Sequence, residues 1–137
     1  MEEKYETAIE TALGGSIQNI VTDTQKTAKK MIEYLKKNRY GRVTFLPLDA
    51  VKGKEFARKE ILLEPGVIGA ANQLVIYDEV YKDLFASLLG QILVVKDMDV
   101  GIKIANKYHH SVRIVTLDGD SLNRGGAMSG GAFKNKS

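Results

Sequence analysis

The chain has 137 residues, 44% of them hydrophobic, a formal net charge of +3 and no cysteine. This length suits one domain or two small lobes with a real core, and the absence of cysteine excludes a disulfide framework, a thiolate nucleophile and a Cys-based metal site, which predicts an intracellular setting. Residues 1–20 lack a signal-peptide layout and no apolar run approaches the roughly 20 residues of a membrane span, so we expect a soluble protein with no membrane partner.

The first half of the chain predicts the order helix, strand, helix, strand. Apolar residues recur at helical spacing from Tyr5 to Leu13 and end at Gly14-Gly15, which is typical of a helix closed by a glycine in the left-handed conformation. A strand over 17–21 and an N-cap at Asp23 or Thr24 follow. A second helix and a strand over 42–46 complete the half. The buried stripe of that second helix is predicted to contain Ala28, Met31, Ile32 and Leu35.

Residues 47–72 have weak periodicity and several charges, with Pro65-Gly66 as a turn. They predict a connector, and the sequence leaves open whether it is an excursion that bridges two lobes or a partly ordered loop.

The second half repeats the order of the first. A helical stripe runs from Tyr81 to Gly90, a strand covers 92–95, Asp97 caps a further helix, and 112–117 form the closing strand. Because Tyr5–Gly14 and Tyr81–Gly90 share their spacing, the sequence predicts a duplicated unit and a mixed α/β fold. We expect a single domain, 1–137, with lobe one at about 1–50, a connector at about 51–72 and lobe two at about 73–137.

A glycine-rich run near the end of the chain has few large side chains to shield its backbone. Another backbone can therefore come close to it. A phosphate loop is excluded because Ala132 stands where a lysine is needed, and the dinucleotide-binding pattern is absent. The run therefore predicts contact between two backbones, with a flexible tail as the alternative. Its residues are Gly125, Gly126, Ala127, Met128, Ser129, Gly130 and Gly131.

No group of residues predicts catalysis, a metal site, a cofactor or a small-molecule substrate. The adjacent His109 and His110 point in different directions. The run Asp118-Gly119-Asp120 opens like a calcium loop, but Leu122 has no oxygen at the next ligand position. Glu6 and Glu10, one helical turn apart, indicate a solvated helix face, and Ser129 lacks a base.

Positive charge is clustered between Lys26 and Arg42, where seven lysines and arginines face the single acid Glu33. We expect no interleaved aromatic residues and no recognition-helix pattern that reads bases there. The cluster therefore predicts either a solvated helix face or a surface for phosphates.

Three segments in order resemble the hinge domain of bacterial structural maintenance of chromosomes (SMC) proteins: Lys4–Gly14, Gly41–Leu48 and Ile114–Asp120, the last leading into the glycine run. The resemblance implies a hinge of two pseudo-symmetric lobes that dimerises two coiled-coil arms, in a chromosome condensation and segregation protein of the cytoplasm and nucleoid. It also implies ATP-binding heads at the remote ends of the full chain. Neither arms nor heads are in this sequence, so no enzyme activity is expected.

The resemblance further implies a homodimer, with the glycine run at its interface, and weak sequence-independent DNA binding. Family hinges begin with an additional strand where Met1-Glu2-Glu3 stands here, so we expect a trimmed fragment. The alternative is a free-standing nucleic-acid-binding domain that uses the face from Lys26 to Arg42. The residues expected to contact DNA are Lys134 and Lys136, beside the arm junction, and Lys29, Lys30, Lys36, Lys37 and Arg39.

Overall fold

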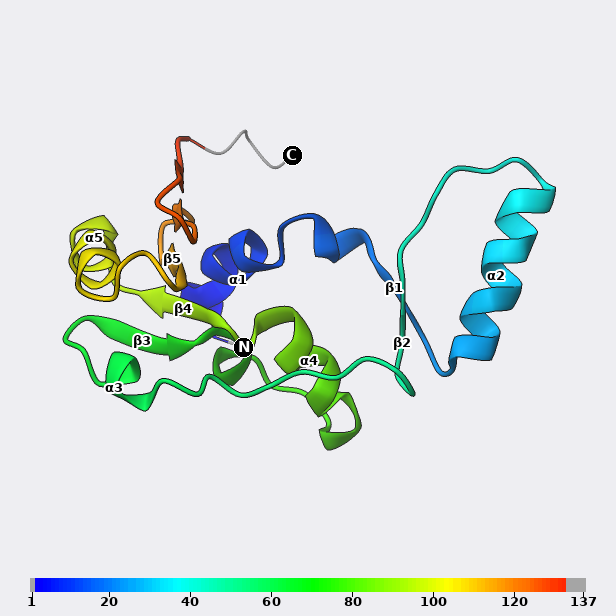
Figure 1. Ribbon diagram of the computed structural model, residues 1–137, viewed down its shortest axis with the longest axis horizontal. Coiled ribbons are helices and arrows are strands. Elements are labelled where there is room, and N and C mark those ends of the chain that lie inside the picture. The colour runs from blue at the N-terminus through cyan, green and yellow to red at the C-terminus, as the bar shows by residue number, and fades with distance from the viewer. Residues whose placement is uncertain (1, 133–137) are drawn as a thin grey trace.

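The computed structural model describes residues 2–132, which form a two-stranded and a five-stranded sheet with helices around them (Figure 1). The α-helices are α1 (Glu6–Leu13), α2 (Gln25–Lys37), α3 (Lys59–Leu62), α4 (Lys82–Leu89) and α5 (Met98–Lys107). The strands are β1 (Ile20–Thr22), β2 (Phe45–Pro47), β3 (Val67–Ala70), β4 (Ile92–Val95), β5 (Arg113–Thr116), β6 (Ser121–Leu122) and β7 (Met128–Ser129). Short 3-10 helices are η1 (Glu3–Tyr5), η2 (Gly14–Gln18), η3 (Ala71–Leu74) and η4 (Glu79–Tyr81).

The small lobe consists of β1, α2 and β2. The two strands are parallel, with Ile20 opposite Phe45, and α2 is the crossover that parallel strands require. The helix begins where the Thr24 hydroxyl accepts a hydrogen bond from the Thr27 amide at 3.2 Å. In Figure 1 this lobe extends away from the five-stranded sheet.

The large lobe is built on the five-stranded sheet, in the order β3-β4-β5-β6-β7. Its β4 and β5 are parallel, and α5 crosses between them after Asp97 accepts a hydrogen bond from the Val100 amide at 3.0 Å. Each half of the chain thus has a parallel strand pair joined by a capped helix. The predicted helix–strand–helix–strand order of both halves is confirmed.

Two apolar clusters cover the two faces of the large sheet. One contains Ile104 and Ile114, and the other joins Ala8 and Ile9 of α1 to Val94 and further residues of β4 and β5. Helix α1 therefore packs on the large sheet although it belongs to the first half of the chain. The packing does not follow the predicted lobe boundary near residue 50, because the five-stranded sheet offers α1 a wider apolar face than the small lobe has.

The segment predicted as a connector, 51–72, contains α3 and β3. Strand β3 pairs antiparallel with β4, and both Phe56 and Ile61 are buried in the core. The segment also runs against α4, where a Cβ on Gly53 would lie 2.0 Å from the Ser87 amide nitrogen. The expected connector is thus part of the large lobe. Its four-residue helix and four-residue strand are too short to produce a clear periodicity.

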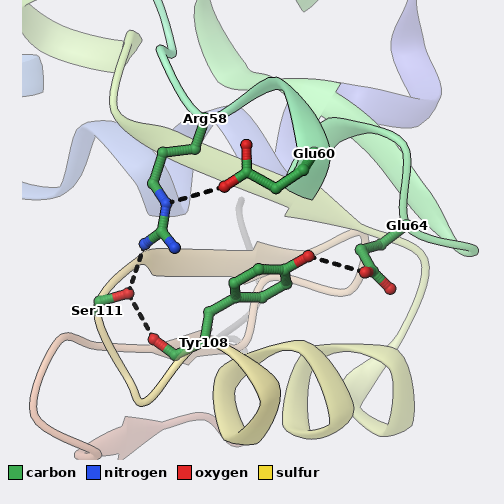
Figure 2. A network of polar contacts seen from close by, with 5 residues as sticks. All are labelled: Arg58, Glu60, Glu64, Tyr108 and Ser111. Atoms are coloured by element: carbon green, nitrogen blue, oxygen red, sulfur yellow. Dashed lines mark hydrogen bonds and ion pairs between the residues drawn. The ribbon is translucent and has the colours of Figure 1, made fainter.

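A polar network joins this segment to the end of α5 (Figure 2). The Arg58 guanidinium donates to the Ser111 hydroxyl at 2.9 Å, and the Tyr108 hydroxyl donates to the Glu64 carboxylate at 2.8 Å. The hydrogen bond from the Lys107 ammonium, followed by that from Tyr108, holds the pKa of the Glu64 carboxyl below its ordinary value. The network fixes the chain entering β3 against the C-terminal end of α5.

The core of the small lobe is thinner than predicted. Of the stripe expected on α2, Ala28 is buried, whereas Met31 and Ile32 are 38% and 40% exposed. Two strands of three residues cannot cover the apolar face of a 13-residue helix. Within residues 2–132, no helix has the length and apolar character that a membrane crossing needs.

Candidate functional site

The glycine-rich run forms the outer half of a β-hairpin. Strand β7 pairs antiparallel with β6, and the Asn123 amide donates to the Ala127 carbonyl at 2.7 Å. The turn needs positive φ at Gly125 and Gly126, 87° and 105°, which glycine adopts at little cost. The Gly125 amide donates to the His110 carbonyl at 3.0 Å, which anchors the turn to the end of α5. The run thus contains a turn at Gly125 and Gly126 and the strand β7, which Gly130 and Gly131 follow.

The outer edge of β7 presents an unpaired backbone. Because the pair Asn123 and Ala127 is hydrogen-bonded, the neighbouring pair Leu122 and Met128 is not, and the Met128 amide and carbonyl point away from β6. In the described part of the chain, β6 is the single neighbour of β7. The Met128 side chain is 53% exposed. An extended segment of another chain could pair at this edge.

The glycines of the run differ in their surroundings. A Cβ on Gly130 would lie 2.4 Å from Asp120 Oδ1, so the Asp120 side chain would have to move to admit one. A Cβ on Gly125 or Gly131 would meet nothing within 4 Å. The run also borders a hollow of about 340 Å³ lined by small and polar residues: Thr11, Gly119, Ser121, Ser129, Gly130, Gly131 and Ala132.

The small lobe presents a second open backbone edge, at β1. The Ile20 amide donates to Thr44 and the Thr22 carbonyl accepts from Leu48, so both residues bond toward β2. The amide and carbonyl of Val21, between them, therefore point outward. Ile20 and Val21 are 40% and 43% exposed. The outer edge of β2 is less suited to pairing because Pro47 has no amide hydrogen.

The structure places the predicted basic residues along one helix and beyond its end. Among the described residues of α2, Lys29 forms the one ion pair, with Glu33 at 3.9 Å. Lys134 and Lys136 lie outside the described residues. The remaining predicted contacts, Lys30, Lys36, Lys37 and Arg39, are exposed.

The expectation that no aromatic residues interleave with this charge is wrong. Tyr34 and Tyr40 are each 60% exposed, and their ring centroids lie 6.1 Å apart at an interplanar angle of 46°. The spacing of the sequence could have shown this, because Tyr34 follows Met31 by three positions and therefore lies beside the apolar stripe of α2, next to the lysines.

The candidates weighed for catalysis lie on different elements. Ser129 lies on β7, and His109 and His110 follow α5 with positive φ of 59° and 54°. Within residues 2–132, no three His, Asp or Glu side chains gather closely enough to hold a metal ion. Among the described residues, the arrangement offers two open strand edges and a basic, aromatic surface.

Comparison with known proteins shows several similarities. Residues 1–105 match the family model of the SMC proteins flexible hinge domain. The chain is 45% identical over 99% of its length to the chromosome partition protein Smc of Desulfitobacterium hafniense, and 43% identical over 98% to that of Bacillus subtilis. It spans 11% and 12% of these two relatives.

Solved structures give the same result. The hinge domain of Geobacillus stearothermophilus SMC, an asymmetric dimer, matches with a TM-score of 0.90 at 45% identity, over 98% of this chain and 56% of that one. The Pyrococcus furiosus SMC hinge domain matches with a TM-score of 0.78 at 33% identity, over 99% of this chain and 69% of that one.

Proposed function

Because this chain belongs to the SMC flexible hinge domain family, we propose that it is the non-enzymatic homodimerisation hinge of a chromosome partition protein. In that role it joins two coiled-coil arms, which lie elsewhere in the full protein together with the ATPase heads. The full protein acts on the nucleoid in the cytoplasm. The relative from Geobacillus stearothermophilus is itself described as a hinge dimer, which supports this role.

The observation that carries the proposal is the pair of open strand edges. Strand β7 presents the outward amide and carbonyl of Met128 between glycines that add no side-chain wall, and β1 presents those of Val21. In the proposed dimer the glycine run of one protomer, Gly125 to Gly131, lies against an edge of the partner's β1–β2 sheet. Backbone pairing supplies the contact and Met128 adds an adaptable apolar one.

Two such contacts close the assembly. If each protomer offers both edges, a two-fold axis makes the contacts equivalent and leaves neither edge free for further chains. A specific association of this kind buries about 1,000 Å² or more. The exposed Ile20 and Val21 supply apolar area that the small lobe does not bury by itself.

Sedimentation equilibrium of Met128→Pro tests the proposal. Proline removes the outward amide hydrogen of residue 128 but no hydrogen bond of the β6–β7 ladder, so the hairpin is kept while pairing with a partner is lost. We expect a dimer for the parent chain and a folded monomer for Met128→Pro. The matched control, Met128→Ala, keeps the amide and stays dimeric at micromolar concentration.

A second variant tests whether the glycines of the run are needed for dimerisation. Replacing Gly125, Gly126 and Gly131 by alanine adds three methyl groups in each protomer where the partner's backbone comes close in the proposed dimer, whereas Gly130 is kept because its Cβ would also meet Asp120 of its own chain. At about 1 kcal/mol per site, the loss corresponds to several orders of magnitude in the dimer dissociation constant. An unchanged mass for both this variant and Met128→Pro contradicts the interface.

A second proposed function is weak, sequence-independent DNA binding through phosphate contacts. The exposed cations of α2 support it, because Lys30, Lys36 and Lys37 have no acidic partner among the described residues. The residues proposed are Lys29, Lys30, Lys36, Lys37 and Arg39, with Lys134 and Lys136 outside the described part of the chain.

Salt dependence tests the phosphate contacts. If about four phosphates are neutralised, the logarithm of affinity for duplex DNA falls with the logarithm of salt concentration at a slope near −4. We expect Lys36→Glu with Lys37→Glu to flatten that slope and to leave the dimer mass unchanged. Binding that is independent of salt excludes phosphate contacts, and a monomer that still binds favours a free-standing nucleic-acid-binding domain.

A further inference from the structure

The end of α2 and the loop after it carry an aromatic pair within the basic cluster. The rings of Tyr34 and Tyr40 lie at a centroid distance of 6.1 Å and are inclined by 46°, and each residue is 60% exposed. Apolar ring faces of this size are normally packed against protein. Here both tyrosines are more than half exposed. They belong to the small lobe, which projects from the large sheet (Figure 1).

Cations flank both rings. Lys30 and Lys37 lie four residues before and three residues after Tyr34, so they are its neighbours on the helix surface. Arg39 and Arg42 stand on either side of Tyr40 in the loop. Among the described residues, none of these four cations forms an ion pair. The surface is therefore complementary to a ligand that is both anionic and rich in exposed aromatic faces.

The chain places one of these cations where glycine is preferred. Arg39 has a φ of 55°, at the position just beyond α2 where the Tyr40 amide closes the helix by donating to the Leu35 carbonyl at 2.9 Å. This left-handed conformation is unfavourable for residues with a Cβ. The Arg39 side chain forms no hydrogen bond or ion pair with a described residue, so its guanidinium is free to bind an anion.

A hollow lies beside the second ring. It has a volume of about 280 Å³ and combines apolar walls from Ile32, Leu35 and Val43 with the cations Lys36 and Arg42. Tyr40 forms part of its lining. A hollow with apolar walls and positive charge nearby suits one nucleobase. The phosphates on either side of that nucleotide would then lie on the cations.

We propose that Tyr34 and Tyr40 form a stacking platform for unpaired bases of single-stranded DNA, with Lys30, Lys37, Arg39 and Arg42 on the adjoining phosphates. A duplex hides the faces of its bases, so rings that stack can engage a single strand only. The proposal rests on the proposed DNA binding, to which it adds the form of the DNA and the residues that recognise it.

Fluorescence anisotropy with a labelled 20-nucleotide oligothymidylate tests the platform on the intact chain. The comparison ligands are an abasic strand with the same number of phosphates and a duplex of the same length. We expect the oligothymidylate to bind at least tenfold more tightly than the abasic strand, since stacking on an aromatic ring strengthens binding by roughly 5- to 150-fold per base.

Variants test whether the two tyrosine rings cause the difference in affinity between the oligothymidylate and the abasic strand. Tyr34→Ala with Tyr40→Ala is expected to lower affinity for oligothymidylate by tenfold or more, to change affinity for the abasic strand and the duplex less than twofold, and to leave the salt slope unaltered. The matched Tyr34→Phe with Tyr40→Phe keeps both ring faces and retains binding. Circular dichroism checks that the small lobe stays folded.

Arg39→Gly separates recognition from folding. It is expected to reduce the salt slope for single strands by about 0.7, the loss of one phosphate contact, with thermal stability unchanged or raised because glycine suits the positive φ. Lys103→Ala, on the corresponding helix of the large lobe, is the control and leaves the slope unaltered.

The outcomes separate the two proposals. Equal affinity for oligothymidylate and abasic strand overturns the stacking platform but leaves phosphate binding intact. Equal loss on all three ligands in the alanine double variant also overturns the platform. Absence of binding to every DNA ligand by the parent chain overturns the platform and the proposed DNA binding together, and the dimer mass reports separately on the hinge.

Discussion

The small and large lobes share a strand–helix–strand unit but differ in how far other segments of the chain bury its strands. In both, a parallel strand pair is joined by a capped helix, and both pairs follow a short 3-10 helix and an eight-residue helix. All four residues of β4 are buried, whereas two of the three residues of β1 are exposed. The large lobe gains β3, β6, β7 and α1 from other parts of the chain, and within residues 2–132 the small lobe gains no further strand.

The difference shows that a strand–helix–strand unit is not a complete core. Its strands become buried when further strands close the edges and helices close both faces. The large lobe has these parts in its own chain. The small lobe has unfinished apolar surface, which fits its proposed role in contacts with a partner.

The largest expected contrast comes from apolar truncation in corresponding strands. Ile114→Ala in β5 removes a fully buried side chain and should lower the free energy of unfolding by about 2–5 kcal/mol. Ile20→Ala in β1 removes a side chain that is 40% exposed, and should cost less than about 1 kcal/mol. Urea unfolding in the Met128→Pro background excludes any contribution from dimerisation. Equal losses would contradict the contrast between the lobes.

A second contrast uses glycines in the two lobes. Gly53→Ala places a methyl group 2.0 Å from the Ser87 amide nitrogen and should destabilise the large lobe by about 1–3 kcal/mol through overpacking. Gly41→Ala in the small lobe meets nothing within 4 Å and should change stability by about 0.5 kcal/mol or less. Thermal unfolding compares the two, and a larger loss for Gly41→Ala would show that the small lobe is packed more tightly than the structure describes.

Removal of the two helix N-caps compares the two lobes through a smaller loss of stability. Thr24→Ala and Asp97→Ala each remove one N-cap hydrogen bond, worth about 1 kcal/mol. Because α5 packs into the large core, Asp97→Ala should lower the global unfolding midpoint. Thr24→Ala should instead accelerate amide hydrogen exchange within α2 and leave the midpoint nearly constant. Equal midpoint shifts would mean that both lobes unfold as one unit.

The smallest expected effect is the acid dependence of the network in the large lobe. The pKa of Glu64 is lowered in the folded state, first by the hydrogen bond from Lys107, so its contribution is present above the ordinary value of 4.5 and is lost as the pH falls through the folded pKa. The difference in unfolding midpoint between the parent chain and Glu64→Gln should be constant around neutral pH and shrink in acid.

The matched control lies in the small lobe. Glu33→Gln breaks an exposed pair with Lys29 at 3.9 Å, and solvent screens such pairs. We expect no measurable shift of the midpoint at any of these pH values. A pH-independent effect of Glu64→Gln would place its role in packing instead of charge.

Features that depend on a few consecutive residues were predictable. The cap at Asp97, a cap at Asp23 or Thr24, and the order of helices and strands in both halves follow from short-range hydrogen bonding and periodicity. The structure has this order and places the first cap at Thr24. The glycine run also predicted an exposed backbone, because the absence of side chains is a property of the sequence itself. Its contact with a partner stays a prediction.

The tertiary structure alone decided which surfaces are covered. Helix α1 packs on the sheet of the other half, β3 arises from a segment without periodicity, and the apolar stripe of α2 stays half-exposed beside the Tyr34–Tyr40 pair. The burial of an apolar face depends on which distant segment of the chain packs against it. An amphipathic pattern shows that a segment has such a face, but it does not show which segment will cover the face. The sequence thus determined the local elements, and long-range packing determined which of their faces remain free for other molecules.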